Sequence, residues 1–175
     1  YRGDNSFSVE EYKRPKFEVV FDEVKEEYKL NQKVEIKGKA EAFSGAPIGG
    51  ATVSYNVERN PIYIWRYYGY YWNNKQNGET ITHGELTTDA DGKFTIPFTS
   101  IPADEKSKYK RSYTYKITVT VTDVNGETHD KETSVVIGDL TRRINLDVAN
   151  QSLQSDFKEL NVKATNLNNV KVNGK

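Results

Sequence analysis

The sequence predicts an all-β protein, an antiparallel two-sheet β-sandwich followed by the truncated start of a second one. The first observation behind this expectation is a period-two alternation of apolar and polar residues, typical of strands with one face on a core. The second is the set of short turn sequences between these runs. The third is an internal repeat, in which residues 160–175 resemble residues 34–51. No stretch shows the 3.6-residue period of an amphipathic helix.

The first strands are predicted by their apolar spacing. Phe17, Val19 and Phe21 alternate with polar neighbours, and the next two runs alternate small or apolar residues with Lys, Glu, Thr and Ser. The later strands have the same pattern, most clearly where Tyr, Ile and Val alternate with Thr. In order, the seven predicted strands are residues 16–25, 33–43, 51–59, 78–88, 93–98, 111–123 and 127–138. Seven short strands favour an immunoglobulin-like or fibronectin-III-like sandwich. We expect its core to contain Tyr55, Val57, Ile117, Val119 and Val121.

Two turns have recognisable chemistry. Asp89-Ala90-Asp91-Gly92 has the first oxygens of a calcium loop but lacks the distal Glu and is followed at once by a strand. A β-turn with Asx hydrogen bonds is therefore expected there. Asn125-Gly126 lies between two predicted strands and favours the positive φ values of a type I′ hairpin.

The internal repeat sets the predicted domain organisation. Aligned without gaps, the two copies superpose Ile36 on Leu160, Ala40 on Ala164, Phe43 on Leu167, Ile48 on Val172 and Gly50 on Gly174. Only the first copy is followed by a full set of strands. We therefore expect residues 1–14 to be a terminal strand or linker from a preceding domain, residues 15–138 a complete sandwich, and residues 139–175 the first strands of an incomplete one. Apolar residues of that last unit should be less buried than their first-unit counterparts: Ile144, Leu146, Val148, Leu160 and Val162.

Composition excludes several classes of function. The 175 residues contain no Cys, which excludes disulfides, thiolate metal sites and a thioester within this segment. Lys plus Arg and Asp plus Glu both number 25, so the zero net charge gives no electrostatic drive toward nucleic acid. No apolar run approaches the ~20 residues that span a bilayer, so direct membrane insertion is not expected. The two histidines, His83 and His129, lack ligand or triad spacing. We expect no catalytic residue, metal site or cofactor.

The most unusual segment is an aromatic loop between the third and fourth predicted strands, residues 61–72. Tyr and Trp combine apolar area with a polar tip, which suits interfaces and stacking on sugar rings. One interpretation is that the rings cap the sandwich or pack on a neighbouring domain, and the other is that they bind a carbohydrate or other ligand. The candidate interaction surface consists of Tyr63, Trp65, Tyr67, Tyr68, Tyr70, Tyr71 and Trp72.

Four motifs follow one another in order through nearly the whole chain: residues 9–19, 37–40 with 44–51, 88–98, and 121–128. Together they resemble motifs of the bacterial alpha-2-macroglobulin family. In the same order, they are similar to the junction between successive macroglobulin-like domains and to the next two strands, the mid-domain turn and the last hairpin of such a domain. The resemblance implies a macroglobulin-like domain plus the start of another, within a large protein of the cell envelope, periplasmic or surface-exposed.

The resemblance also implies a function for the parent protein. Members of the family trap proteases, since a bait region is cut, the molecule rearranges, and in many members a Cys-Gln thioester captures the attacker. No Cys-x-x-Gln occurs here. The implied role is a non-catalytic scaffold of an endopeptidase inhibitor, whose partners are neighbouring macroglobulin-like domains and, through the full-length protein, a target protease. The alternatives are a carbohydrate- or ligand-binding sandwich that uses the aromatic loop, and the stalk of a cell-surface adhesin.

Overall fold

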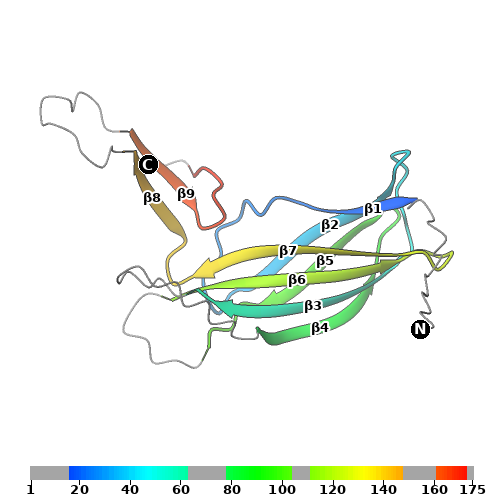
Figure 1. Cartoon of the computed structure of the whole chain (residues 1–175), viewed down its shortest axis with the longest axis horizontal. Coiled ribbons are helices and arrows are strands. Elements are labelled where there is room, and N and C mark those ends of the chain that lie inside the picture. The colour runs from blue at the N-terminus through cyan, green and yellow to red at the C-terminus, as the bar shows by residue number, and fades with distance from the viewer. Residues whose placement is uncertain (1–15, 63–77, 104–110, 148–160, 173–175) are drawn as a thin grey trace, which may run out of the picture.

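The computed structural model describes residues 16–62, 78–103, 111–147 and 161–172 (Figure 1). These residues form strands and turns without a helix, so the predicted all-β class is confirmed. The strands are β1 (Phe17–Phe21), β2 (Lys33–Ala42), β3 (Thr52–Pro61), β4 (Glu79–Thr87), β5 (Lys93–Thr99), β6 (Ser112–Thr122), β7 (Thr128–Gly138), β8 (Arg142–Asp147) and β9 (Asn161–Asn166). The seven strands predicted in the first unit therefore all form, although β1 ends four residues earlier than expected.

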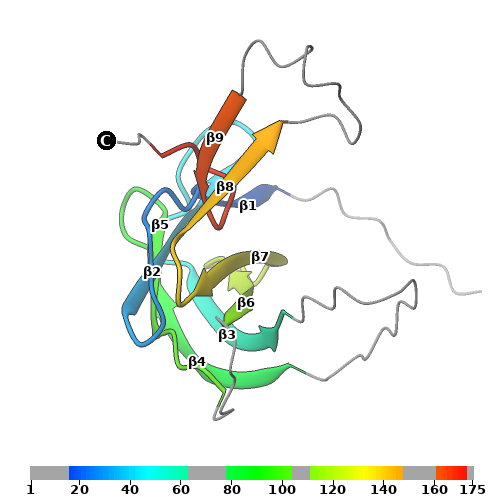
Figure 2. The same cartoon turned by 90° about the vertical axis from the view of Figure 1, so that its left-hand side faces the viewer.

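Two antiparallel sheets make the sandwich, with strand orders β1-β2-β5 and β4-β3-β6-β7 (Figure 2). A third, two-stranded sheet of β8 and β9 stands off the end of the sandwich at which β3 and β7 finish (Figure 1). The alternation seen in sequence becomes alternating burial, clearest in β6, where every second residue from Tyr113 to Val121 is buried. Each such strand therefore has one face in the space between the sheets.

The core lies between the two sheets and is apolar. Phe17, Ile36 and Ile96 enter it from the first sheet, each 1% exposed or less. The residues predicted for the core are found there: Val57, Ile117, Val119 and Val121 are fully buried, and Tyr55 is partly buried against the same cluster.

The turns share one construction. Gly92 N donates to Asp89 O (3.0 Å), and Gly126 N donates to Asp123 O (3.1 Å). Gly92 and Gly126 have φ values of 73° and 82°, whereas Asn125 is not among the described residues with positive φ. The type I′ prediction for Asn125-Gly126 is therefore wrong, because that turn needs positive φ at both central residues. A single left-handed glycine after a type I turn is the three-residue alternative.

The repeat found in sequence is present in the hydrogen bonding. Phe17 pairs with Ala42 at the end of the β1–β2 hairpin, and Arg142 pairs with Asn166 at the end of the β8–β9 hairpin. After the second strand of each pair, the Ala42 N–H donates to Ala46 O at 2.7 Å, and the Asn166 N–H donates to Val170 O at 2.8 Å. A second pair of hydrogen bonds corresponds in the same way: Ile48 N donates to Ala40 O at 3.0 Å, and Val172 N donates to Ala164 O at 3.2 Å. These backbone hydrogen bonds of the first segment therefore recur at the aligned positions of the second.

Burial differs between the two hairpins as expected where side chains are described. Val19 pairs with Ala40 and is 3% exposed, whereas Ile144 pairs with Ala164 and is 68% exposed. Val162 is also exposed. Leu146, Val148 and Leu160 lie outside the residues whose side chains the structure describes. The face of the hairpin that would enter a core is therefore open in this chain.

Candidate functional site

The aromatic loop predicted as an interaction surface, Tyr63 to Trp72, lies outside the described residues. Its base is described, because β3 ends at Pro61 and β4 begins at Glu79. Arg59 and Glu79 are cross-strand partners and form an ion pair there. Arg59 Nη1 also donates to Ile101 O at 3.0 Å, and its guanidinium carbon lies 5.6 Å from the centroid of the Tyr113 ring. The two strands from which the loop emerges are therefore tied together.

Arg59 is a residue that sequence reasoning missed. It is only 7% exposed, because it continues the inward-facing series of Val53, Tyr55 and Val57 along β3. A buried guanidinium needs partners, and the carboxylate, carbonyl and aromatic face supply them. The available sequence signal was the position of Arg59 in the inward-facing series of β3. That position predicts that Arg59 is buried, but it does not identify its partners.

The base of the loop lies at the same end of the sandwich as the junction with β8. Pro61 pairs with Tyr113 on β6, and Tyr113 pairs with Ile137 on β7, one residue before that strand ends. Adjacent strands lie ~4.8 Å apart, so the ends of β3 and β7 are about 10 Å from each other. Figure 1 shows both ends beside β8. A loop that leaves β3 at this position starts close to the neighbouring hairpin.

The junction is a contact between the turn after β9 and the edge of β7. β7 is the outermost strand of its sheet, so half of its backbone groups have no strand partner. Val136 N donates to Asn168 Oδ1 at 2.7 Å, and Asn168 Nδ2 donates to Val136 O at 3.4 Å. The side-chain amide of Asn168 thus takes the place of a peptide group from an adjacent strand.

Two neighbours of Asn168 complete this contact. Asn166 is 1% exposed; its Oδ1 accepts from the N–H groups of Asn168 and Val170, both at 2.9 Å, and its Nδ2 donates to Val24 O at 3.4 Å. Leu167 lies against Gly138, where a Cβ would be 3.3 Å from Leu167 Cδ1 and 2.8 Å from Arg111 O. Because Gly138 of β7 has no side chain, it leaves room for the side chain of Leu167.

The linker that leads into β8 is held by charged groups. Thr141 Oγ1 donates to Glu27 Oε2 at 2.9 Å, and Arg142 Nε contacts both Glu27 carboxylate oxygens at 3.0 Å. The hydrogen bond from Arg142 lowers the pKa of Glu27, with that from Thr141 second, so the carboxylate stays ionised at neutral pH. Arg111 N donates to Asp139 Oδ2 at 2.8 Å on the other side of the linker.

The other sequence candidates have structural roles. Asp89 Oδ1 accepts from the N–H groups of Asp91 (2.9 Å) and Lys93 (2.8 Å), which confirms a β-turn with Asx bonds. His129 Nε2 lies 2.8 Å from Glu127 Oε1, and its ring meets Phe17 edge-on at 4.4 Å. His83 is exposed on β4. Within the described ranges, no three His, Asp or Glu side chains gather in a way that could hold a metal ion.

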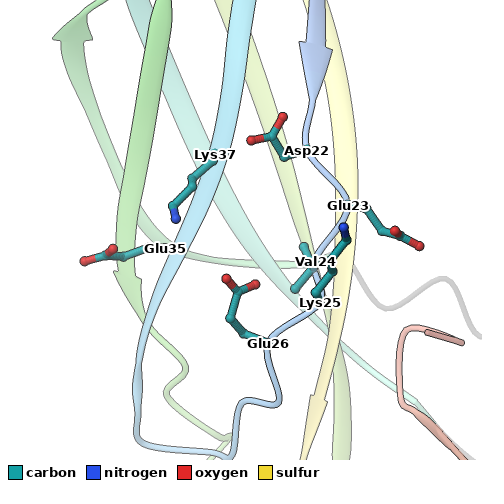
Figure 3. Close-up of a pocket in the computed structure, with 7 residues that line it drawn as sticks. All are labelled: Asp22, Glu23, Val24, Lys25, Glu26, Glu35 and Lys37. Atoms are coloured by element: carbon teal, nitrogen blue, oxygen red, sulfur yellow. The ribbon is translucent and has the colours of Figure 1, made fainter. Parts of the chain in front are cut away.

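One shallow cavity of about 330 Å³ lies between β2 and the segment that follows β1 (Figure 3). It mixes acidic and basic side chains with one apolar residue and includes no histidine or hydroxyl nucleophile. The lining residues are Asp22, Glu23, Val24, Lys25, Glu26, Glu35 and Lys37.

Comparison with solved structures supports the fold. No family model and no curated protein matches the sequence. Among solved structures, native Escherichia coli alpha-2-macroglobulin is 13% identical over 91% of this chain, with a TM-score of 0.58. Salmonella alpha-2-macroglobulin reacted with methylamine is 12% identical over 90%, also with 0.58, and the trypsin-activated E. coli protein is 12% identical over 85%, with 0.56.

These similarities concern one region of much larger proteins. The chain spans 10% to 11% of the length of those three structures. At such low identity the likeness shows the β-sandwich fold of that region. In the part of the chain that the structure describes, no helix is long and apolar enough to cross a membrane.

Proposed function

We propose that this chain is a non-catalytic structural module of an alpha-2-macroglobulin-like endopeptidase inhibitor. In this proposal residues 15–138 are one macroglobulin-like sandwich, residues 139–175 begin the next, and residues 1–14 belong to the end of a preceding one. The observation that carries it is the repeated hairpin, because β8–β9 has the register and turn of β1–β2. Two such openings in series are what an array of sandwiches requires. The shared fold with alpha-2-macroglobulins supports the same proposal.

The role of the module is to hold neighbouring units in a fixed arrangement. Asn168 on the edge of β7, Leu167 against Gly138, and Arg142 with Glu27 connect two consecutive units by polar and apolar contacts. In the parent protein, where later strands would complete the second sandwich, the short linker that is bonded on both sides is expected to limit the relative movement of the two units. A target protease would meet the full-length protein, which we place in the cell envelope, in the periplasm or at the surface.

The proposal is tested on the full-length protein with an endopeptidase such as trypsin. A trap encloses the protease without blocking its active site. Hydrolysis of a large protein substrate should therefore fall by at least tenfold, while hydrolysis of a small chromogenic peptide continues. The control is the same assay after the full-length protein has been heat-unfolded. Equal loss of both activities, or loss of neither, contradicts the trap.

A second candidate function is carbohydrate or ligand binding by the aromatic loop, and the tied base of that loop favours it. Arg59 and Glu79 fix the positions at which the loop leaves β3 and rejoins β4. Trp65 and Trp72 are the only tryptophans, so their fluorescence reports on the loop alone. Under the scaffold proposal, titration with a panel of polysaccharides leaves this fluorescence unchanged. A saturable micromolar shift that Trp65→Ala and Trp72→Ala abolish would favour the binding module instead.

A further inference from the structure

We infer that the turn after β2, residues 42–47, is a docking surface for the last strand of a preceding β-sandwich in the same polypeptide. This inference rests on the serial arrangement of the proposed function. The turn lies at the end of the sandwich opposite β8, where β1 begins and β3 starts (Figure 1). We call it the N-terminal docking turn.

The first step is the equivalence of this turn with one that is docked in this chain. In the turn after β9, Asn169 N donates to Asn166 O at 3.1 Å, and in the N-terminal docking turn Gly45 N donates to Ala42 O at 2.7 Å. Asn169 and Gly45 both have positive φ, 65° and 85°. The residue two positions after each strand end, Ser44 in the first turn and Asn168 in the second, is therefore held by the backbone in the same way. In the later turn that residue is Asn168, which binds the edge of β7.

The second step is the exposure of an apolar side chain that is covered in the docked turn. Phe43 occupies the place of Leu167, and 61% of Phe43 is exposed. Leu167 is partly buried and lies against Gly138 of β7. A single exposed apolar residue is ordinary at a protein surface, so it is the equivalence of Phe43 with Leu167, and not its exposure alone, that indicates a covering partner. The equivalent contact supplies the partner, which is the edge of the last strand of the preceding sandwich.

The third step is a difference in polar chemistry between the two turns. Ser44 occupies the place of Asn168, and its single hydroxyl can bond an N–H or a C=O group of a strand edge, whereas the amide of Asn168 bonds both. Ala42 replaces Asn166 and lacks the oxygen that braces the later turn. The larger ring of Phe43 therefore has to supply more of the contact.

The test is photocrosslinking in the full-length protein expressed from its own gene. Phe43→p-benzoylphenylalanine is irradiated, and the crosslinked peptides are sequenced by mass spectrometry. We expect a product that joins position 43 to a peptide N-terminal to Tyr12 in the same polypeptide, with a yield independent of protein concentration. A product with the residues next to Lys16 needs no docking, because Phe43 N already donates to Lys16 O at 3.2 Å. The same substitution at His83, an exposed residue on β4, should give no such product. Absence of the upstream product, or a product that joins separate polypeptides, overturns the inference.

A second readout does not depend on the crosslinker. Phe43→Ser should leave the melting temperature of the 175-residue chain unchanged, because the side chain is exposed there. In the full-length protein it should raise the rate of limited proteolysis N-terminal to Lys16 about tenfold or more. An unchanged cleavage rate overturns the docking. If the crosslink forms but the protein traps no protease, the docking stands and the proposed function fails, so the two failures can be told apart.

Discussion

Val119→Asp is expected to unfold the sandwich. Val119 is fully buried at the middle of β6, between Tyr55 on β3 and Lys131 on β7, and its side chain faces the opposite sheet. An aspartate there has no partner in an apolar core, so it must be buried charged or neutralised, at a cost of several kcal/mol. Since domains of this kind are stable by only ~5–15 kcal/mol, the melting transition should fall by tens of degrees or vanish.

The matched control is Thr118→Asp, one residue earlier on the same strand. Thr118 faces outward, where an aspartate stays hydrated, and its cross-strand neighbours are Asn56 and Glu132. Repulsion from Glu132 should cost less than about 1 kcal/mol. A Val119→Asp protein that melts like the Thr118→Asp protein would mean that the inward register of β6 is wrong.

Gly92→Ala is expected to have the second-largest effect. Gly92 is buried in the turn before β5 with φ of 73°, and its carbonyl accepts from Ala40 N at 2.8 Å. A Cβ would lie 2.4 Å from the carbonyl oxygen of Ala40, so the backbone between the turn and β2 has to move. Left-handed strain costs ~1–3 kcal/mol, and overpacking of this kind typically adds ~1–3 kcal/mol. We expect a loss of roughly 2–6 kcal/mol in urea unfolding.

Gly126→Ala separates the two contributions. Gly126 has φ of 82° in an equivalent turn, but a Cβ there would meet nothing within 4 Å. This variant therefore keeps the conformational strain and omits the clash. Equal losses for the two variants would show that the close approach of Gly92 to β2 is absent in solution.

The strands could be predicted from sequence because each has one face in the core. A period of two then follows from burial alone, and β6 shows it over its whole length. The hairpin repeat was also predictable from the gap-free alignment, which places Ala40 on Ala164 and Ile48 on Val172. The structure shows the same backbone hydrogen bond within each copy, Ile48 to Ala40 and Val172 to Ala164. The type I′ turn was wrong because Asn-Gly suits more than one positive-φ turn, and the loop length decides between them.

The contacts of the junction could not be predicted. Asn168 bonds Val136, 32 residues earlier, and the pairing depends on β7 being an edge strand, which sequence does not state. The sequence places Arg59 on the inward face of β3 but does not identify its partners, because Glu79 and Ile101 come from other segments. Asn166 and Asn168 predict a turn, but the surface that the turn touches is a tertiary property.

The central claim is that β8 and β9 open a second unit that docks on the first, instead of completing it. Two strands alone are marginally stable, and few contacts hold them to β7. Hydrogen exchange in the 175-residue monomer tests this most directly. Strand-bonded amides in residues 142–147 and 161–166 should exchange orders of magnitude faster than those in residues 115–121, because the hairpin can open while the core stays closed. Equal protection in both regions would contradict the account, since β8 and β9 would then belong to one cooperative fold.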